Sequence, residues 1–531
     1  MIKRIKRIVL IFVCGLGCCE CYSQAPPGIQ WEKSYGGTNN EKAYSIHQTS
    51  DNGYIIGGIT WSDDGDVSGI HGVNADYWVV KTDSMRNIQW QKCLGGSLDD
   101  IASSVQQTMD GGYIVVGYTR SMDGDVIGSH GQNDFWIVKL NIGGTIQWQK
   151  CLGGTDLDNA FSIQQTFDGG YIVAGETISN DGDVNGNNGD FDFWIVKLDD
   201  AGTIQWQKCY GGTDYDRAFC IRQTSDGGYI IAGETFSNDV DVDGNHGNND
   251  YWVLKIDSSS VVQWQKCIGG TNDEQANSIQ ETTDGGYIVT GSTLSNDSDV
   301  YGNHGSWDCW MVKLNNSGNI QWQKCLGGTG LDFGFSCQQN NIGEYVVAGL
   351  TFSNDGDVNG NHGFGDFWII NIDSLGIFQW QKCLGGSGKD VGLFIQQTTD
   401  EGYIASGLAS SIDGDVTGNH GGNDFWIVKF ASDSITSVHN LPSSASNLQL
   451  FPNPATSTIQ LTTNTKHNAP VECEIVNVMG ERVLTALLRA PLTPKGEPAH
   501  MEIDVSGLAK GVYVVRVGDG VKRENKKLVV E

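Results

Sequence analysis

Tryptophan recurs along this chain at a nearly constant interval, and this spacing constrains the fold more than any other feature of the sequence. One series stands in Gln-Trp pairs that are 59 residues apart once and 58 residues apart thereafter: Trp31, Trp90, Trp148, Trp206, Trp264, Trp322 and Trp380. A second series keeps an interval of 58 residues throughout: Trp78, Trp136, Trp194, Trp252, Trp310, Trp368 and Trp426. The chain therefore contains seven copies of one structural unit, and such units bury their apolar faces by packing against their neighbours.

Each unit contains four short strand-like runs separated by turn residues. The runs are rich in aromatic and β-branched residues, and no helical period of appreciable length is present. An Asp-Gly-Gly turn joins the first two runs, and a long polar loop joins the second run to the third. In the third copy the runs cover residues 160–166, 171–177, 191–198 and 204–209. Four antiparallel strands repeated seven times predict an all-β fold, a seven-bladed β-propeller.

The two ends of the repeat array favour a closed ring. The first copy begins with a lone fourth strand, residues 29–34, and the last copy ends after its third strand, residues 425–430. In a ring, the N-terminal strand would complete the last blade and close the circle. An open β-solenoid is the alternative, but it would be expected to carry polar capping units. We therefore predict a propeller over residues 24–432 that is closed by its N-terminal strand.

The amino-acid sequence of the repeat also resembles that of a known class of propeller. Residues 193–199 and 202–208 of the third copy are similar to the strand-turn-strand segment of quinoprotein-type (PQQ-type) propellers, in which a turn glycine precedes a tryptophan. The resemblance implies the propeller fold and says little about activity, because one fold supports many functions.

Residues 1–23 have the order of charges and apolar residues that is typical of a secretory signal peptide. Basic residues at the very N-terminus precede an apolar run at residues 8–13, which is too short to span a membrane. Cleavage near Ser23 and lipoprotein processing at Cys18 or Cys19 both fit this segment. We expect an exported protein without a transmembrane span.

The repeat stops before a serine-rich linker at residues 433–447, and a different module follows at residues 448–531. Alternating apolar runs and turn glycines predict a small β-sandwich there. Residues 450–455 (Leu-Phe-Pro-Asn-Pro-Ala), 474–480 and 508–517 closely resemble the C-terminal sorting domain of type IX secretion cargo from Bacteroidota. This resemblance implies contact with the type IX secretion machinery and release or attachment at the cell surface. An ordinary adhesive sandwich module is the alternative.

The long loop of each unit carries acidic residues at fixed positions. Three copies match the pattern Asp-x-Asp-x-Asp/Asn-Gly-x5-Asp, which is similar to the calcium loop of EF-hand proteins. There, hard oxygen ligands at positions 1, 3, 5 and 12 surround the ion, and glycine at position 6 permits a sharp bend. The predicted calcium ligands are Asp181, Asp183, Asn185, Asp192, Asp239, Asp241, Asp243, Asp250, Asp355, Asp357, Asn359 and Asp366. In the other reading, Asp, Asn and Gly are simply good turn formers.

A second acidic residue recurs just before the first strand of each unit, and we expect it to share a face with the long loops. The series is Glu41, Asp100, Asp158, Asp216, Glu274, Asp332 and Asp390. Six cysteines also recur once per unit, with Ser34 in their place in the first copy: Cys93, Cys151, Cys209, Cys267, Cys325 and Cys383. Equivalent positions on stacked sheets are about 10 Å apart, too far for a disulfide. These cysteines are therefore predicted to be free, buried thiols.

Charge and residue distribution limit the possible functions. A net charge of −30 argues against binding to nucleic acid. Catalysis needs an asymmetric cluster of side chains, whereas nearly all polar features here recur in every unit. We therefore predict a noncatalytic, monomeric surface or secreted protein that binds a glycan or protein partner through calcium-stabilised loops. Trp61, Tyr301 and Trp307 break the repeat beside those loops and are candidate contacts. A calcium-dependent extracellular hydrolase or lyase acting on glycans is the alternative.

Overall fold

The computed structural model describes residues 25–432 and, in the C-terminal part, residues 448–451, 455–463, 471–477, 482–488, 499–508, 511–518 and 523–530. The chain divides into two compact units, Met1–Ser434 and Ile435–Glu531. The predicted signal peptide and linker lie outside the described residues. No helix among the described residues is long and apolar enough to cross a lipid bilayer.

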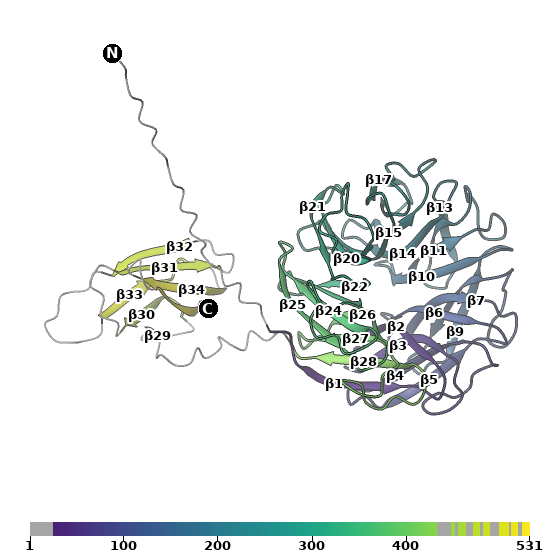
Figure 1. Ribbon diagram of the computed structural model, residues 1–531, viewed down its shortest axis with the longest axis horizontal. Coiled ribbons are helices and arrows are strands. Elements are labelled where there is room, and N and C mark those ends of the chain that lie inside the picture. Colours follow the sequence, from purple (N-terminus) through teal and green to yellow (C-terminus); the bar gives the residue numbers. More distant parts are fainter. Residues whose placement is uncertain are drawn as a thin grey trace, which may run out of the picture. The chain divides into compact units, whose positions relative to one another are not determined.

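The first unit is a ring of seven four-stranded antiparallel sheets (Figure 1). The inner strands are β2 (Glu41–Gln48), β6 (Asp100–Gln107), β10 (Asp158–Gln165), β14 (Asp216–Gln223), β18 (Glu274–Glu281), β22 (Asp332–Gln339) and β26 (Asp390–Gln397). The second strands are β3 (Tyr54–Thr60), β7 (Tyr113–Thr119), β11 (Tyr171–Thr177), β15 (Tyr229–Thr235), β19 (Tyr287–Thr293), β23 (Tyr345–Thr351) and β27 (Tyr403–Ala409).

The third strands are β4 (Asp76–Thr82), β8 (Asp134–Leu140), β12 (Asp192–Leu198), β16 (Asp250–Ile256), β20 (Asp308–Leu314), β24 (Asp366–Ile372) and β28 (Asp424–Phe430). The outer strands are β5 (Ile88–Leu94), β9 (Ile146–Leu152), β13 (Ile204–Tyr210), β17 (Val262–Ile268), β21 (Ile320–Leu326), β25 (Phe378–Leu384) and, for the last blade, β1 (Ile29–Tyr35). We number the blades 1 to 7 from the one that begins with β2.

Blade 7 is closed by the N-terminal strand, as predicted. The order of its strands is β1-β28-β27-β26. Tyr35 pairs with Phe425 and Lys33 with Ile427, in antiparallel register. The ring of blades is therefore completed by noncovalent contacts between the two ends of the repeat array.

The tryptophan at the third strand of each blade is fully buried and joins two blades. Trp194 of β12 packs on Phe135 of the preceding blade, with ring centroids 4.4 Å apart. Its indole Nε1 donates to Gln207 Oε1 at 2.8 Å on the neighbouring strand β13. This pairing satisfies the one polar atom of a large apolar side chain. The constant interval of this tryptophan series therefore reflects one such contact between each blade and the one before it.

A buried lysine fixes the hairpin at the other end of most blades. The Lys197 ammonium is 3.0 Å from an Asp168 carboxylate oxygen and donates to Leu198 O at 2.9 Å. Blade 6 replaces this pair, because Asn371 Nδ2 donates there to Glu344 Oε2 at 3.1 Å. The six cysteines of the repeat are free and buried, as predicted.

The second unit contains two small antiparallel sheets. One has the order β29 (Leu448–Phe451), β30 (Thr458–Thr463) and β33 (Ala499–Asp504). The other has the order β32 (Arg482–Leu488), β31 (Val471–Asn477), β34 (Gly511–Gly518) and β35 (Arg523–Val530). Ile459 and Ile503 of the first sheet share a core with Ile475 and Val515 of the second. The two sheets therefore pack face to face, in the manner of the predicted sandwich.

Candidate functional site

One end of the propeller carries the long loops between second and third strands and the turns that lead from one blade to the next. We call this end the loop face. Thr155, in the turn before β10, donates through N to Asp181 Oδ1 at 2.8 Å and through Oγ1 to Oδ2 at 3.0 Å. The first aspartate of each loop therefore binds the turn that leads into its own blade. The same main-chain bond recurs in every blade, from Thr38, Ser97, Thr213, Thr271, Thr329 and Ser387 to Asp64, Asp123, Asp239, Asp297, Asp355 and Asp413.

The residues at the third and fifth loop positions also form hydrogen bonds within the propeller. The Asp183 amide donates to Gly153 O at 2.9 Å, and Gly153 N lies 3.4 Å from the Asp183 carboxylate. Asn185 contributes its main-chain oxygen, which accepts from Gln207 Nε2 at 3.2 Å. Asp243 and Asn359 accept in the same way from the equivalent glutamines, at 3.0 and 2.8 Å.

The residue at the twelfth loop position lies at a different blade junction, by which we mean the contact between two adjacent blades. Asp192 is the first residue of β12 and is fully buried. Its Oδ2 accepts from Asn188 N at 2.9 Å. A Cβ added to Gly211, in the turn to the next blade, would lie 2.4 Å from Asp192 Oδ1 and 2.6 Å from Asp216 Oδ2. Asp192 therefore lies beside the inner-strand acid of the following blade, whereas Asp181 and Asp183 contact the turn from the preceding blade.

The structure consequently separates the twelve predicted calcium ligands instead of gathering four around one point in each loop. In the other two complete loops, Asp239 and Asp355 bind the turn into their own blades, while Asp250 and Asp366 begin the third strands. Asp241 and Asp357 donate through their amides to Gly211 O and Gly327 O. Among the residues that the structure describes, no group of three or more His, Cys, Asp or Glu side chains is placed to hold one metal ion.

Each blade junction instead contains a pair of buried carboxylates. The inner-strand acid Asp216 is well satisfied, because it accepts from Ser237 Oγ at 2.9 Å, Gly212 N at 2.7 Å and Thr235 Oγ1. The third-strand acid is not. Within the described residues its Oδ1 accepts no hydrogen bond in any blade: Asp76, Asp134, Asp192, Asp250, Asp308, Asp366 and Asp424. Seven buried oxygen atoms thus point into the junctions without a partner.

Burial raises the pKa of the third-strand carboxyl in every blade. The pKa of Asp192 rises to about 7, through burial and the charges of Asp216 and Asp241. The pKa of Asp216 rises to about 6, chiefly through burial. Blade 4 has His246 where blade 3 has Asn188, and its Nδ1 lies 2.6 Å from Asp250 Oδ2. This contact counters the effect of burial on Asp250, whose pKa rises to about 6.

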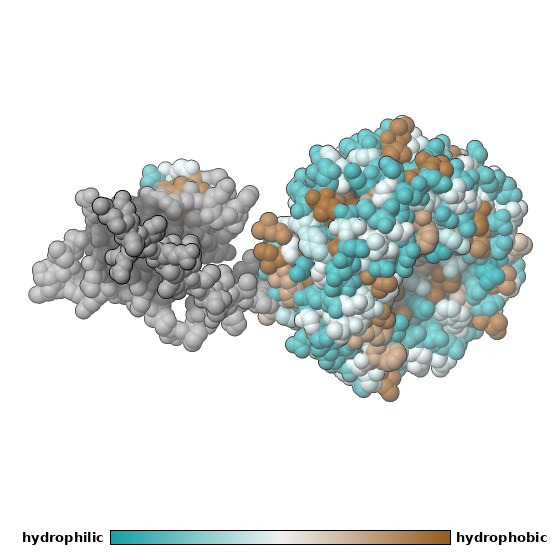
Figure 2. Space-filling model, turned by 45° about the horizontal axis from the view of Figure 1, so that its top comes forward, coloured by the Kyte–Doolittle hydropathy of each residue, from teal (hydrophilic) through white to brown (hydrophobic). Residues whose placement is uncertain are grey.

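Aromatic side chains break the sevenfold symmetry at the loop face. The ring centroids of Trp307 and Phe333 are 6.0 Å apart, and Phe333 stacks on Phe335 with centroids 6.1 Å apart. Phe352 meets Phe364 edge to face at 6.1 Å, and Phe364 is 72% exposed. We call these five residues, which belong to blades 5 and 6, the aromatic arc. Figure 2 shows that hydrophobic residues form separate patches on a propeller surface that is otherwise largely hydrophilic.

The other two predicted aromatic contacts lie apart from this arc. Tyr301 is 66% exposed in the loop of blade 5. Trp61 is half-buried and lines a cavity of about 460 Å³ together with Tyr118 and Arg120. Trp307 therefore lies beside the loops, as predicted, whereas the phenylalanines near it were not predicted from the repeat.

A charged group occupies the loop face at blades 3 and 4. Arg217, near the start of β14, places Nε 3.0 Å from Glu176 Oε2 and Nη1 3.7 Å from Glu234 Oε1. Burial raises the pKa of Glu234 to about 7, although the charge of Arg217 opposes this. The guanidinium carbon also lies 5.5 Å from the rings of Phe191 and Tyr215. The loop face therefore presents an aromatic side and a charged side.

Comparison with known families identifies the C-terminal unit. Residues 449–531 match the family model described as a secretion system C-terminal sorting domain. The C-terminal unit is a type IX secretion sorting domain. The sorting domain directs the protein to the cell surface or the outside of the cell, as predicted.

The other comparisons give low sequence identity and, for solved structures, low structural similarity. Regulatory protein FlaEY of Caulobacter vibrioides is 27% identical over 164 residues, which are 28% of this chain and 17% of that protein. Among solved structures, Sqt1 from Chaetomium thermophilum has a TM-score of 0.41 at 11% identity, covering 76% of this chain and 100% of that chain. A puromycin hydrolase has a TM-score of 0.42 at 11% identity, covering 73% of this chain and 53% of that chain. These similarities carry no argument about function.

Proposed function

We propose that the exported propeller is a noncatalytic binding module that holds a glycan or protein partner at its loop face. The aromatic arc carries this proposal. Phe364 is largely exposed and the other four side chains are half-buried. Aromatic side chains that reach a polar surface are typical of interaction sites, because they offer a large rigid contact area. The loops that present the arc are fixed by hydrogen bonds from a Thr or Ser and to a Gly of the turn at every junction, so little ordering would be required on binding.

The distribution of polar groups supports binding without catalysis. The acidic groups of the loops recur in every blade and are engaged with the turns. The four arginines of the propeller do not converge: Arg86 and Arg120 follow β4 and β7, whereas Arg217 and Arg222 both lie on β14. The resemblance to quinoprotein-type propellers adds no quinone cofactor to this proposal, because it concerns only the strand-turn-strand segment.

A second candidate function, hydrolysis or lytic cleavage of a glycan, rests on Glu234. A carboxyl group whose pKa is close to 7 is suited to general acid catalysis. Glu176 lies on the other side of Arg217, so the site contains two carboxyl groups. Under this alternative Glu234→Gln would abolish product release, whereas under the binding proposal there is no release to abolish.

We also propose that calcium, as the ion suggested by the loops, is held at the blade junctions. The carboxylates of Asp192, Asp216 and Asp241 influence one another there, and the buried Oδ1 of Asp192 has no partner in the described chain. Asp241 is exposed and would have to turn inward to complete a site. The affinity expected for an extracellular site is ~0.1–1 mM.

Calcium binding is tested by titrating the chelated protein while following its melting temperature. At 10 mM calcium, one site with this affinity would stabilise the fold by roughly 1–3 kcal/mol. Asp192→Asn should reduce the shift, and the exposed turn variant Asp200→Asn should leave it unchanged. No shift at 10 mM calcium would contradict the calcium proposal without affecting the binding proposal.

The binding proposal is tested on a polysaccharide and glycan panel that records retention and reducing-end release separately. We expect retention without release, and we expect Phe364→Ala to weaken it. Phe167→Ala is the matched control, because Phe167 is 70% exposed in the hairpin at the opposite end of the blade. Release of reducing ends would favour the hydrolase or lyase. Equal losses in both variants would show that the aromatic arc is not the contact.

A further inference from the structure

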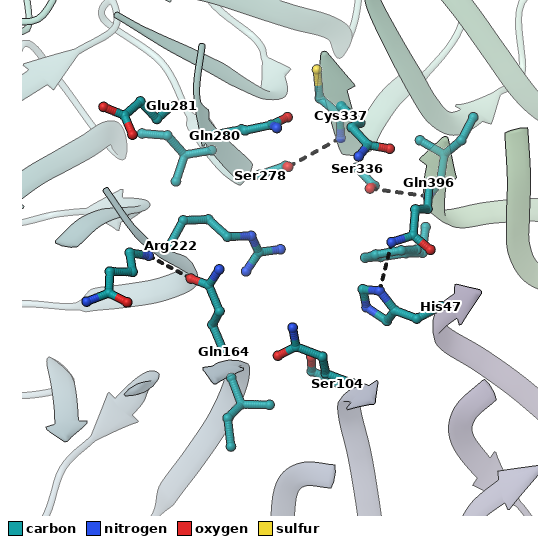
Figure 3. Close-up of a pocket in the computed structure, with 17 residues that line it drawn as sticks. His47, Ser104, Gln164, Arg222, Ser278, Gln280, Glu281, Ser336, Cys337 and Gln396 are labelled. Carbon is teal, nitrogen blue, oxygen red and sulfur yellow. Dashed lines mark hydrogen bonds between the residues drawn. The ribbon is translucent and has the colours of Figure 1, made fainter. Parts of the chain in front are cut away.

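The inner strands surround a cavity of about 380 Å³ at the end opposite the loop face (Figure 3). Its walls are formed by the second half of these strands, which lead into the hairpins to the second strands. One position of the repeat supplies a ring of seven side chains here, which we call the axial ring. Its members are His47, Gln106, Gln164, Arg222, Gln280, Gln338 and Gln396.

The five glutamines of the axial ring bind the neighbouring blade through their oxygen atoms. Gln164 Oε1 accepts from Gln223 N at 2.6 Å, and Gln280 Oε1 accepts from Gln339 N at 3.0 Å. Gln106, Gln338 and Gln396 accept from Gln165 N, Gln397 N and Gln48 N in the same way. A main-chain N–H can only donate, so it fixes the amide with its oxygen toward the strand. The amide nitrogens of these cavity-lining residues are left as donors.

Arg222 interrupts this ring with a positive charge. Its Nη1 donates to Ile221 O at 2.7 Å and to Ser162 Oγ at 3.2 Å. Its Nε and Nη2 donate to no residue in the described chain. These two atoms form the edge of a guanidinium that matches the two oxygens of a carboxylate. Figure 3 shows the guanidinium reaching from the wall toward the middle of the cavity.

His47, across the cavity from Arg222, also presents a donor. Gln396 Oε1 is already occupied by Gln48 N, so its amide nitrogen donates to His47 Nδ1 at 3.1 Å. The proton of the neutral imidazole therefore lies on Nε2. Burial, together with the charge of Arg222, lowers the pKa of His47 to about 4. The imidazole of His47 packs on the ring of Phe394, with centroids 5.0 Å apart.

The negative group at this cavity is directed elsewhere. Glu281 lines the wall, but its two oxygens accept from Ser225 N at 2.7 Å and Ser225 Oγ at 2.8 Å in the adjacent blade. Burial raises the pKa of Cys337, another lining residue, to about 12, so its thiol is neutral. In a chain with a net charge of −30, the cavity thus combines one cation with several N–H donors.

We propose that the axial cavity binds a small organic carboxylate, whose carboxylate group pairs with the Nε and Nη2 edge of Arg222. The remaining oxygen atoms of the ligand would accept from the glutamine amides. A volume of about 380 Å³ is at the lower end of the range for small-molecule sites, which suits a compound the size of a sugar acid. The single positive charge of Arg222 balances a monoanionic carboxylate, whereas a phosphate dianion would bring one uncompensated negative charge into the cavity. This site is separate from the loop face and does not depend on the partner proposed there.

The test is isothermal titration calorimetry of the whole protein with D-glucuronate, with D-glucose and inorganic phosphate as comparison ligands. We expect binding of glucuronate, no binding of glucose and weaker binding of phosphate. Arg222→Gln restores the residue that five other blades carry, so the fold should be kept. It should weaken glucuronate binding at least tenfold, while Arg120→Gln should not change it.

A second measurement keeps the proposal falsifiable if glucuronate is not the preferred acid. The melting temperature is recorded with a set of hydroxycarboxylates for the wild type and for Arg222→Gln. A shift that occurs only in the wild type supports the proposal. The absence of a shift with every carboxylate, a shift that persists in Arg222→Gln, or tighter binding of phosphate than of any carboxylate would overturn it.

Discussion

Removing the Glu32 side chain is expected to loosen the closure of the ring. The buried Trp426 Nε1 donates to Glu32 Oε2 at 2.9 Å, and Thr417 Oγ1 donates to Oε1. The other outer strands have glutamine in place of Glu32. The glutamine Oε1 accepts from the tryptophan of its blade, and the glutamine Nε2 donates to a main-chain oxygen of the long loop. In β1 that bond comes from Ser34 Oγ, which donates to Thr417 O at 2.9 Å. Glu32 and Ser34 therefore act together at the only blade whose outer strand comes from the other end of the array.

The magnitude follows from the donor that loses its acceptor. In Glu32→Ala, Trp426 Nε1 is left buried without a partner, which costs about 1–3 kcal/mol. No covalent turn joins β1 to β28, so this loss lowers the free energy for detachment of β1. A loss of this size raises the opening equilibrium by roughly 5- to 150-fold. Hydrogen exchange of the β1 and β28 amides should accelerate by that factor.

The control removes the same interaction from a continuous blade. In Gln207→Ala, Trp194 Nε1 loses its acceptor, but a short turn still joins β12 to β13. We expect a similar loss of overall stability and much less acceleration of exchange in β12 and β13. Equal acceleration in both variants, or none at β1 in Glu32→Ala, would refute the argument that β1 is the point where the ring opens.

Three further predictions concern the propeller as a whole. Asp168→Asn should cost about 1–3 kcal/mol in urea unfolding, because Lys197 is 4% exposed while its partner is 56% exposed; adding Lys197→Asn, which imitates Asn371 of blade 6, should recover part of the loss. In chelator, calorimetry should find the highest melting temperature near pH 4–5. Because the pKa values of the junction carboxyls are raised in the folded protein, stability should fall as pH rises from about 4 through 6–7. The pKa values of the hairpin carboxyls Asp51, Asp110 and Asp226 are lowered to about 2, so their contribution to stability should be lost as pH falls from about 4 toward 2. A maximum melting temperature above pH 7 would contradict this prediction. Burial raises the pKa of the Cys93 and Cys151 thiols to about 12, so a thiol reagent should label them only after unfolding.

The architecture could be predicted from the sequence because it follows from repetition. Two tryptophan series at a constant interval specify identical blades, and the unequal ends of the array specify how they close. Pairing of Tyr35 with Phe425 confirms that the lone first strand completes the last blade. This pairing between distant parts of the chain could be predicted from the sequence only because every blade repeats the same strand order.

The arrangement of the loop carboxylates could not be predicted in the same way. Asp181 and Asp192 belong to one sequence pattern, but the loop directs them to two different junctions. A pattern shows spacing along the chain and not the direction of each side chain. The inner-strand acids, such as Asp216, were expected at the loop face, but their pairing with the third-strand acid depends on the packing of adjacent blades. The aromatic arc was missed for a similar reason, because Phe333 and Phe364 lie in separate elements.

The most direct test of the binding proposal is a hydrogen-exchange footprint of the propeller with a retained glycan or protein partner. We predict protection in the loop and strand segments that carry the aromatic arc, residues 299–308, 332–336 and 352–366, and no change at the Asp-Gly-Gly hairpins. Protection confined to the hairpin end, or no protection at the loop face with a partner that is demonstrably bound, would contradict the account.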